Sequence, residues 1–582
     1  VVEVYASVPY TDYDRQNGVE KAAVQLMDFE KTSTLQPGAS QTITMKVDLA
    51  NLASYDANGA KTYIIDPGDY YFAIGTDAHD ALNNVLAAQG KTVADGMTAD
   101  GNAAKTYKWT WTGDVDKTTF AVGKNGTAIT NQLTEGDYAM DYNAFEPGTV
   151  TYLSRADWNG TFPKTYSGLT ANATVSRLLN NDLYTLKTDD DVSDLVFGDT
   201  TSTLTINDMK NAPYDDPRWE ELVNKVTVAE FLDFSANAFH NIQGIASVNM
   251  PQKAADDGPG GSDSHYLNEG GYQGVPYADA ADYTSGTRVA PSPVNLAYAW
   301  NKELAFENGE IILGESTLVL DLPIMIGPGM NIHRHAYNAR GVEYYSEDPI
   351  LSGYVGSAVV QGAQSKGTLV NIKHMGFNDQ EHNRAGISAY MTEQKFRETD
   401  LRGFEGALSD AFGMGVMIAF NRIGATNASH HVGMIQKIVR GEWGFKGLIS
   451  TDMMNNYLYF NAESMVMAGI TQVADFAADN SHINLGEGGV DAVWPHISLE
   501  TVSKDSNLVE QARENLKYQL YIFANSAILN ISTQRVNTWW DTALTVTTYA
   551  SSILAVLFFL AWVVLTLLPE KKPVVVRVEN KR

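Results

Sequence analysis

The chain has 582 residues, of which 44% are hydrophobic and 19% charged, so it is long enough for two or three globular domains. Its 69 acidic residues outnumber its 41 basic residues, which disfavours nucleic acid as a partner because phosphate binding needs Lys and Arg. The chain has no cysteine, which excludes disulfides, thiolate nucleophiles and zinc–thiolate sites.

Residues 1–90 have the pattern of short β-strands separated by turns. Apolar and polar residues alternate at 1–5 and at 41–47, and Pro-Gly pairs at 37–38 and 67–68 mark turns. This pattern predicts a small β-sandwich. Its first strand starts at the first residue, so we expect earlier parts of the domain upstream.

Residues 91–216 are rich in Thr, Asn, Asp and Gly and have weak periodicity, which predicts a connecting region that wraps over a neighbouring domain. The acidic run at 188–191 lacks the glycine and glutamate spacing of a calcium loop and is interpreted as a solvated turn. His333 and His335 alone are weak evidence for a metal. The sequence therefore predicts neither a metal site nor a cofactor.

Residues 217–535 alternate between helical stretches, such as 219–234 and 392–411, and short apolar runs. The apolar runs are 324–326, 369–372, 416–419 and 447–450. The alternation predicts an α/β fold, and the length suits a (β/α)8 TIM-like barrel. The expected architecture is thus a barrel preceded by the β-sandwich.

Each apolar run leads directly into polar residues, and functional groups of such barrels gather past the C-terminal ends of the strands. The residues at these ends are Arg334, Lys373, His374, Phe420 and Asp452, with Asp257 in a further short segment. Carboxylates, arginines and a Lys-His pair together suit a ligand with many hydroxyl groups.

Four motifs carry a resemblance to a known family: 327–334 (GPGMNIHR), 340–349 (RGVEYYSEDP), 372–381 (IKHMGFNDQE) and 440–447 (RGEWGFKG). Over about 217–480 the chain closely resembles glycoside hydrolase family 3. Residues 1–85 resemble the fibronectin type III-like domain of that family. The order of the two domains resembles the inverted, β-glucosidase-like members, which implies an α/β-sandwich domain upstream.

The resemblance implies a retaining β-glycosidase that hydrolyses terminal β-linked sugars from small glycosides or oligosaccharides. Asp452 would be the nucleophile that forms the covalent glycosyl intermediate, and the general acid would lie on the upstream domain. The residues implied to line the sugar subsite are Asp257, Arg334, Arg340, Lys373, His374, Phe420 and Met453. We expect Lys373 and Arg340 to keep Asp452 ionised.

Three departures from the family pattern support an alternative. Phe420 stands where the family usually has Tyr, Met453 stands where it usually has Trp, and 260–264 replaces a segment that usually carries Arg. The alternative function is a catalytically degenerate, membrane-anchored protein that binds glycans. Upstream sequence would discriminate the two, since a sandwich domain with a loop Glu favours the enzyme.

The segment 549–568 has 20 residues and no charge, which predicts a transmembrane helix. Trp539 and Trp540 precede it, and the tail 569–582 has five basic and two acidic residues. The positive-inside rule predicts a single-pass cell-membrane protein with a cytoplasmic tail and an extracellular catalytic domain. That orientation requires an export signal upstream. The sequence makes no prediction of oligomeric state.

Overall fold

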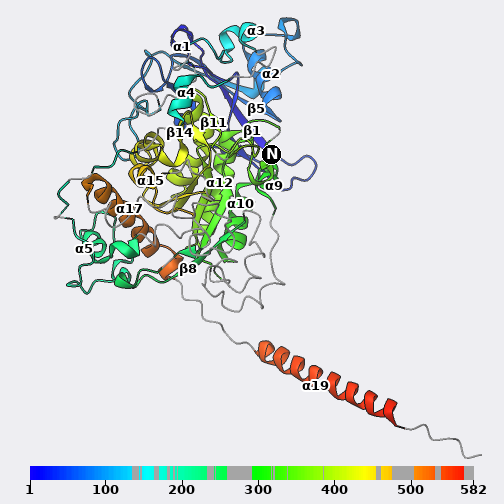
Figure 1. Ribbon diagram of the computed structural model, residues 1–582. Coiled ribbons are helices and arrows are strands. Elements are labelled where there is room, and N and C mark those ends of the chain that lie inside the picture. The colour runs from blue at the N-terminus through cyan, green and yellow to red at the C-terminus, as the bar shows by residue number, and fades with distance from the viewer. Residues whose placement is uncertain are drawn as a thin grey trace, which may run out of the picture. The chain divides into compact units, whose positions relative to one another are not determined.

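The computed structural model of the chain divides into two compact units, residues 1–531 and 532–582 (Figure 1). The structure describes residues 1–133, 143, 147–162, 170–179, 184–187, 190–192, 195–231, 241–242, 244–258, 291–315, 318, 322–336, 338–384, 386–453, 461–474, 504–530 and 539–568. The departure at 260–264 and the tail 569–582 lie outside these residues. Each unit is described by itself.

The N-terminal part of unit 1 contains a four-stranded antiparallel sheet in the order β2-β1-β5-β6. Its strands are β1 (Val2–Ser7), β2 (Gln25–Glu30), β5 (Gly68–Gly75) and β6 (Thr106–Trp111). A separate hairpin pairs β3 (Ser54–Asp56) with β4 (Thr62–Ile64). Strand β6 comes from the segment expected to be a connection, so this sheet extends beyond residue 90.

The strand predicted at 41–47 is wrong. The segment alternates between exposed and half-buried residues, as its sequence indicates, but it forms no strand. Alternation shows only that one face of a segment is less exposed. A strand also needs a partner for its backbone hydrogen bonds, and sequence periodicity does not supply one.

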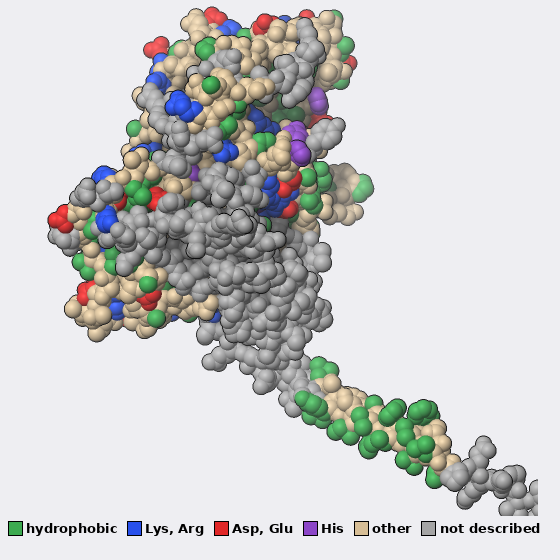
Figure 2. Space-filling view, in the orientation of Figure 1, with side chains coloured by type: hydrophobic (Ala, Val, Ile, Leu, Met, Phe, Trp, Pro, Cys, Tyr) green, Lys and Arg blue, Asp and Glu red, His purple; other side chains and the backbone are tan. Residues whose placement is uncertain are grey.

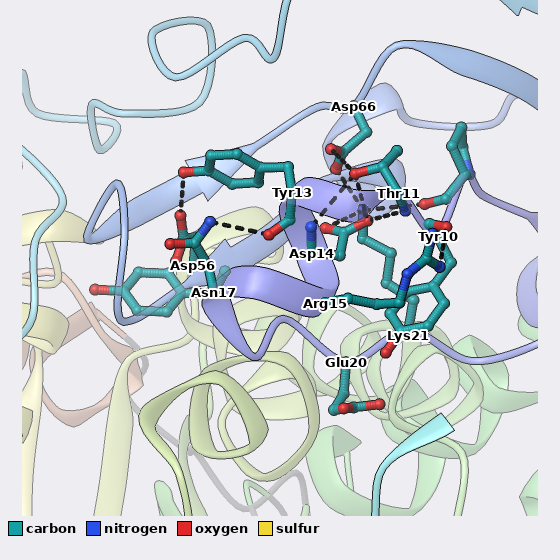
Figure 3. A network of polar contacts seen from close by, with 12 residues as sticks. Tyr10, Thr11, Tyr13, Asp14, Arg15, Asn17, Glu20, Lys21, Asp56 and Asp66 are labelled. Carbon is teal, nitrogen blue, oxygen red and sulfur yellow. Dashed lines mark hydrogen bonds and ion pairs between the residues drawn. The ribbon is translucent and has the colours of Figure 1, made fainter. Parts of the chain in front are cut away.

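A buried polar network fixes helix α1 (Asp12–Asn17) to the sheet (Figure 3). Thr11 caps the helix, and Lys21 donates to the Pro9 carbonyl at 3.1 Å and to Asp14 at 3.0 Å. The same ammonium group pairs with Asp66. The side chains of Asp14 and Asp66 are fully buried and that of Lys21 is 4% exposed. The ammonium group therefore joins the two carboxylates inside the domain.

The second sheet of unit 1 has the strand order β15-β12-β10-β9-β8-β7. These strands are β7 (Asn241–Ile242), β8 (Lys253–Asp257), β9 (Ile324–Gly329), β10 (Leu369–Met375), β12 (Gly415–Ile418) and β15 (Leu448–Thr451). Strands β8 to β15 are parallel and follow chain order, whereas β7 is antiparallel to β8. A further parallel bridge joins Ser450 to Gln472.

This sheet forms where the sequence has continuous apolar runs. Every residue of β9, β10, β12 and β15 is buried, as expected for parallel strands that are covered on both faces. Helices α10 (Lys302–Asn308) and α12 (Pro349–Gln364) lie on the chain between these strands and pack against each other. The parallel α/β arrangement is present, and closure into an eight-stranded barrel stays a prediction.

The two helical predictions of this region have different outcomes. Residues 393–410 form a nearly continuous helical segment, close to the predicted 392–411. The helix predicted at 219–234 is interrupted: α5 (Arg218–Lys225) ends at Val226, which adopts an extended conformation, and residues 232–234 lie outside the described residues. A new helical turn then follows at 228–231.

Within unit 2, the described residues form helix α19 (Trp539–Leu567), which has 29 residues and is followed by Leu568. Within this helix, 22 residues from Val546 to Leu567 form a candidate membrane span. An 18-residue window of this span has a mean hydropathy of 2.4, and no part of the window is buried. Figure 2 shows hydrophobic side chains along the helix. By length and composition alone, this helix can cross a membrane.

Candidate active site

Asp452 directly follows strand β15, at the edge of the sheet where the parallel strands end. Its backbone N–H donates to the Ile418 carbonyl of the neighbouring strand at 3.0 Å, which places the residue beside the end of β12. Its side chain is 8% exposed. Oδ1 accepts a hydrogen bond from the backbone N–H of Met453 at 2.8 Å, which orients the carboxylate.

The second oxygen of Asp452 faces a cation that sequence reasoning missed. Arg384 donates to Oδ2 at 3.1 Å, and its guanidinium lies 4.3 Å from the centre of the Phe420 ring. Glu381 accepts from the same guanidinium at 2.8 Å. Phe420 therefore supports the arginine, and its ring helps to fix the position of the group that contacts Asp452.

Burial and charge act in opposite directions on Asp452. Burial is the largest influence and raises the pKa of its carboxyl above the ordinary value. Arg384, Lys373 and Arg340 act to lower the pKa, with Arg384 the first of the three. Lys373 and Arg340 therefore act in the expected direction, but burial outweighs all three cations, and Arg384 has the largest effect among them.

Lys373 and Asp257 form one side of the site. Lys373 lies on β10 and is buried, and its Nζ donates to Asp257 Oδ1 at 2.5 Å. Asp257 is the last residue of β8, and its side chain is 27% exposed. Two strand ends thus bring together an ammonium group and a carboxylate that remains partly accessible.

His374 lies between Asp452 and Arg340. Its Nε2 is 3.5 Å from Asp452 Oδ2 and 3.2 Å from Arg340 NH1. Burial, Arg340, Lys373 and Arg384 hold the pKa of this imidazole well below its ordinary value, so the ring is neutral. Because a guanidinium only donates, Nε2 accepts and the ring proton is on Nδ1, which faces the Tyr344 hydroxyl at 3.4 Å.

Two residues fix these groups in place. Glu343 binds the guanidinium of Arg340 with both carboxylate oxygens, and the Nε–Oε1 distance is 2.9 Å. Asn331 accepts from the His374 N–H at 2.7 Å and donates to its carbonyl at 2.8 Å. Both side chains orient groups that face Asp452.

Arg334 has a different environment from the other predicted site residues. It donates to Asp379 at 2.5 Å and lines a cavity of about 230 Å³ together with His335 and Asn421. The structure therefore brings Asp257, Arg340, Lys373, His374, Phe420 and Met453 together around Asp452, and it assigns Arg334 to the adjacent cavity.

The sequence analysis did not single out Arg384, Tyr344, Asn378 or Asn331. The sequence signal that could have identified Arg384 is its position as a basic residue in the loop after β10, the strand that carries Lys373 and His374. Within the residues that the structure describes, no group of three or more His, Asp or Glu side chains could hold a metal ion.

Comparisons with known proteins give matches to two segments of the chain. Residues 266–472 match the glycosyl hydrolase family 3 N terminal domain, and residues 1–78 match the fibronectin type III-like domain. A probable beta-glucosidase K of Emericella nidulans is 32% identical over 238 residues, which are 40% of this chain and 26% of that protein. An exo-alpha-(1->6)-L-arabinopyranosidase of Bifidobacterium breve is 31% identical over 221 residues, or 38% and 28%.

Among solved structures, a beta-glucosidase from Paenibacillus barengoltzii matches 92% of this chain and 52% of its own, with a TM-score of 0.61 and 21% identity, which shows a shared fold. The chain spans about a quarter of the length of the curated relatives it matches. Its N-terminal segment is thus similar to a fibronectin type III-like domain and the later segment, which includes Asp452, is similar to a glycosyl hydrolase family 3 N terminal domain.

Proposed function

We propose that the chain carries the nucleophile half of a retaining β-glycosidase, with Asp452 as the nucleophile. The observation that supports this most is the environment of Asp452. It is a buried carboxylate at a strand end, and Arg384, Lys373 and Arg340 act on its charge. Those cations favour the ionised form that nucleophilic attack requires, while burial limits its solvation by water.

In the proposed reaction, a carboxylate oxygen of Asp452 attacks the anomeric carbon as the bond to the leaving-group oxygen breaks. A general acid, expected on an upstream domain, protonates that oxygen. Water then attacks the anomeric carbon, and the bond to Asp452 breaks. The residue that acted as the general acid now acts as a base and takes the proton from the water. The two displacements together retain the configuration of the sugar.

The residues around Asp452 suit the hydroxyl groups of a sugar in the subsite next to the cleaved bond. Asp257 has acceptor oxygens and is partly exposed, while Lys373 and Arg340 are donors. His374 is neutral, so its imidazole contributes hydrogen bonds without adding positive charge. We propose terminal β-linked sugars of small glycosides or oligosaccharides as substrates, with a β-glucoside as the first candidate. An α-L-arabinopyranoside is the second candidate, outside the β-linked class, because a curated relative is named for that sugar.

The glycan-binding alternative is not favoured. Phe420 lacks a hydroxyl, but its ring supports Arg384, and Met453 still donates its N–H to Asp452. Both departures therefore leave the nucleophile oriented. We further propose that α19 anchors the protein in the cell membrane with its catalytic part outside, on the basis of its length and apolar surface.

The decisive experiment is the intact mass of the detergent-solubilised protein after incubation with 2,4-dinitrophenyl 2-deoxy-2-fluoro-β-glucoside. Dinitrophenolate leaves without a proton, so the general acid is not needed, and the fluorine slows hydrolysis of the glycosyl-enzyme. We expect one added fluoroglucosyl mass in the wild type and none in Asp452→Asn. The corresponding α-L-arabinopyranosyl reagent distinguishes the second candidate sugar.

An adduct that persists in Asp452→Asn would overturn the assignment of the nucleophile. Absence of an adduct with both reagents, in protein whose circular dichroism shows a folded α/β domain, would overturn the proposed enzyme. Saturable binding of the sugars under those conditions would support the glycan-binding alternative instead.

A further inference from the structure

A ring of side chains starts at one oxygen of the proposed nucleophile and returns to within 3.5 Å of it; five of its six steps are polar contacts, and the last, between His374 Nε2 and Asp452 Oδ2, is proximity alone. Its members, in order, are Asp452, Arg384, Glu381, Asn378, Tyr344 and His374. The successive distances are 3.1, 2.8, 2.9, 2.7 and 3.4 Å, and the ring closes with 3.5 Å between His374 Nε2 and Asp452 Oδ2. Both groups that face Oδ2 therefore depend on the same set of side chains.

Glu381 joins the two arms of this ring. Its Oε2 accepts from Arg384 NH1, and its Oε1 accepts from Asn378 Nδ2. The first contact leaves Arg384 NH2 free to donate to Asp452. The second holds Asn378, whose Nδ2 also donates to the Tyr344 hydroxyl that faces His374. A single carboxylate thus orients both neighbours of Oδ2.

We propose that Glu381 is a positioning residue of the nucleophile site, which holds Arg384 on Asp452 Oδ2 and fixes His374 through Asn378 and Tyr344. This inference rests on the proposed function of Asp452. Glu381 acts only through other side chains, and its role is to keep Asp452 aligned with the anomeric carbon. Small errors in such alignment are costly, since displacements near 1 Å can reduce rates about 100-fold.

Replacement of Glu381 by Gln removes the charge and one acceptor oxygen while keeping the size of the side chain. Its amide can still accept from one donor, so Arg384 or Asn378 loses its partner. The groups that face Asp452 from neighbouring elements are Arg384, Lys373, Arg340 and His374, and Arg384 is the strongest of the cations. If Arg384 is released, less positive charge opposes the effect of burial, so the pKa of Asp452 rises. The acid limb of the pH–rate profile then moves to higher pH.

The test is the rate of fluoroglycosyl-adduct formation, followed by intact mass against pH and reagent concentration. We expect Glu381→Gln to lower the limiting rate by about 10- to 100-fold, with little change in the half-saturating concentration and a shift of the acid limb to higher pH. The matched control is Glu405→Gln. Glu405 pairs with Arg402 three residues away at 2.5 Å and has a similar exposure, but it is not part of the ring.

A double-mutant cycle separates positioning from a general structural role. If Glu381 acts through Arg384, Glu381→Gln lowers the rate much less in an Arg384→Met background than in the wild type. Additive losses, an unchanged pH profile or an equal loss in Glu405→Gln would overturn the inference. If Glu381→Gln does not fold, Glu381→Asp, whose carboxylate is one methylene shorter, takes its place, and wild-type kinetics in it would also overturn the role.

The outcome for the wild type keeps the two proposals distinguishable. If the wild type forms no adduct, the proposed function fails. If the wild type and Glu381→Gln form the adduct at equal rates, the proposed function stands and only the positioning role is overturned.

Discussion

Buried charges are organised differently in the two domains. In the N-terminal domain, one ammonium group, that of Lys21, lies between Asp14 and Asp66, and all three side chains are buried (Figure 3). Around Asp452, each of three cations has a carboxylate of its own: Arg384 pairs with Glu381, Arg340 with Glu343, and Lys373 with Asp257. Asp452 is the fourth carboxylate of that cluster.

The difference separates a closed cluster from one that a ligand can reach. The Lys21 cluster is closed to solvent, and its partners hold helix α1 against the sheet. In the Asp452 cluster the proposed nucleophile is buried, but the side chains of Asp257, Arg340 and Arg384 are 18–27% exposed. Charged donors and acceptors that remain accessible can bind the hydroxyl groups of a ligand, whereas those of the closed cluster cannot.

The largest expected effect is on stability, from removal of the cation of the closed cluster. Lys21→Met leaves two buried carboxylates without their ammonium partner and should lower the free energy of unfolding by about 3–5 kcal/mol. Urea denaturation followed by circular dichroism measures this. The control Lys108→Met breaks an exposed pair with Asp69 and should leave the free energy near the wild-type value. If both variants have the same stability, the contrast between the clusters is wrong.

Removal of Lys373, one cation of the Asp452 cluster, should affect ligand binding more than folding. Lys373→Met removes the donor that contacts Asp257 at 2.5 Å. Since hydrogen bonds to charged groups contribute about 1.5–3 kcal/mol, we expect a 10- to 100-fold higher half-saturating concentration of the fluoroglycoside. The loss of stability should be smaller than for Lys21→Met because Asp257 reaches water. Unchanged labelling kinetics together with a large loss of stability would reverse the assignment.

A smaller effect is expected at the junction of the two domains. Glu398 accepts from the backbone N–H of Tyr55 in strand β3, and burial raises its pKa to about 7. Because the folded state binds this proton more tightly than the unfolded state, the stability from Glu398 is complete below about pH 4.5 and is lost as the pH rises through 7. Glu398→Gln should therefore be more stable than the wild type at pH 8, by on the order of 1 kcal/mol.

Melting temperatures at pH 8 and pH 5 test this expectation. The stability gap between Glu398→Gln and the wild type should shrink as the pH falls from 8 to 5. A gap that is constant across this range would show that Glu398 does not titrate in it.

Much of the site was predictable because strand ends are visible in a sequence. Continuous apolar runs predicted β9, β10, β12 and β15, and the polar residues after them included Lys373, His374 and Asp452. In a parallel sheet these ends meet at one edge, so a local pattern predicts a cluster. The alternation at 41–47 had no such consequence, because it did not specify a partner strand.

Arg384 illustrates what the sequence did not reveal. It lies in a loop, 68 residues from Asp452, and no periodicity or motif connects the two. The same holds for strand β6, whose pairing with β5 depends on the path of the chain between them. Contacts of this kind depend on how the loops fold over the sheet.

The sequence by itself determined the apolar strands, the polar residues at their ends, the apolar C-terminal segment and the exclusion of thiol chemistry. Each of these depends on residue type or local burial, which nearby residues report. Only the tertiary structure decided that Arg384 contacts Asp452, that Glu381 contacts Arg384, and that Arg334 lines a cavity with His335 and Asn421. These outcomes depend on side chains from distant segments, whose positions follow from the packing of the whole domain.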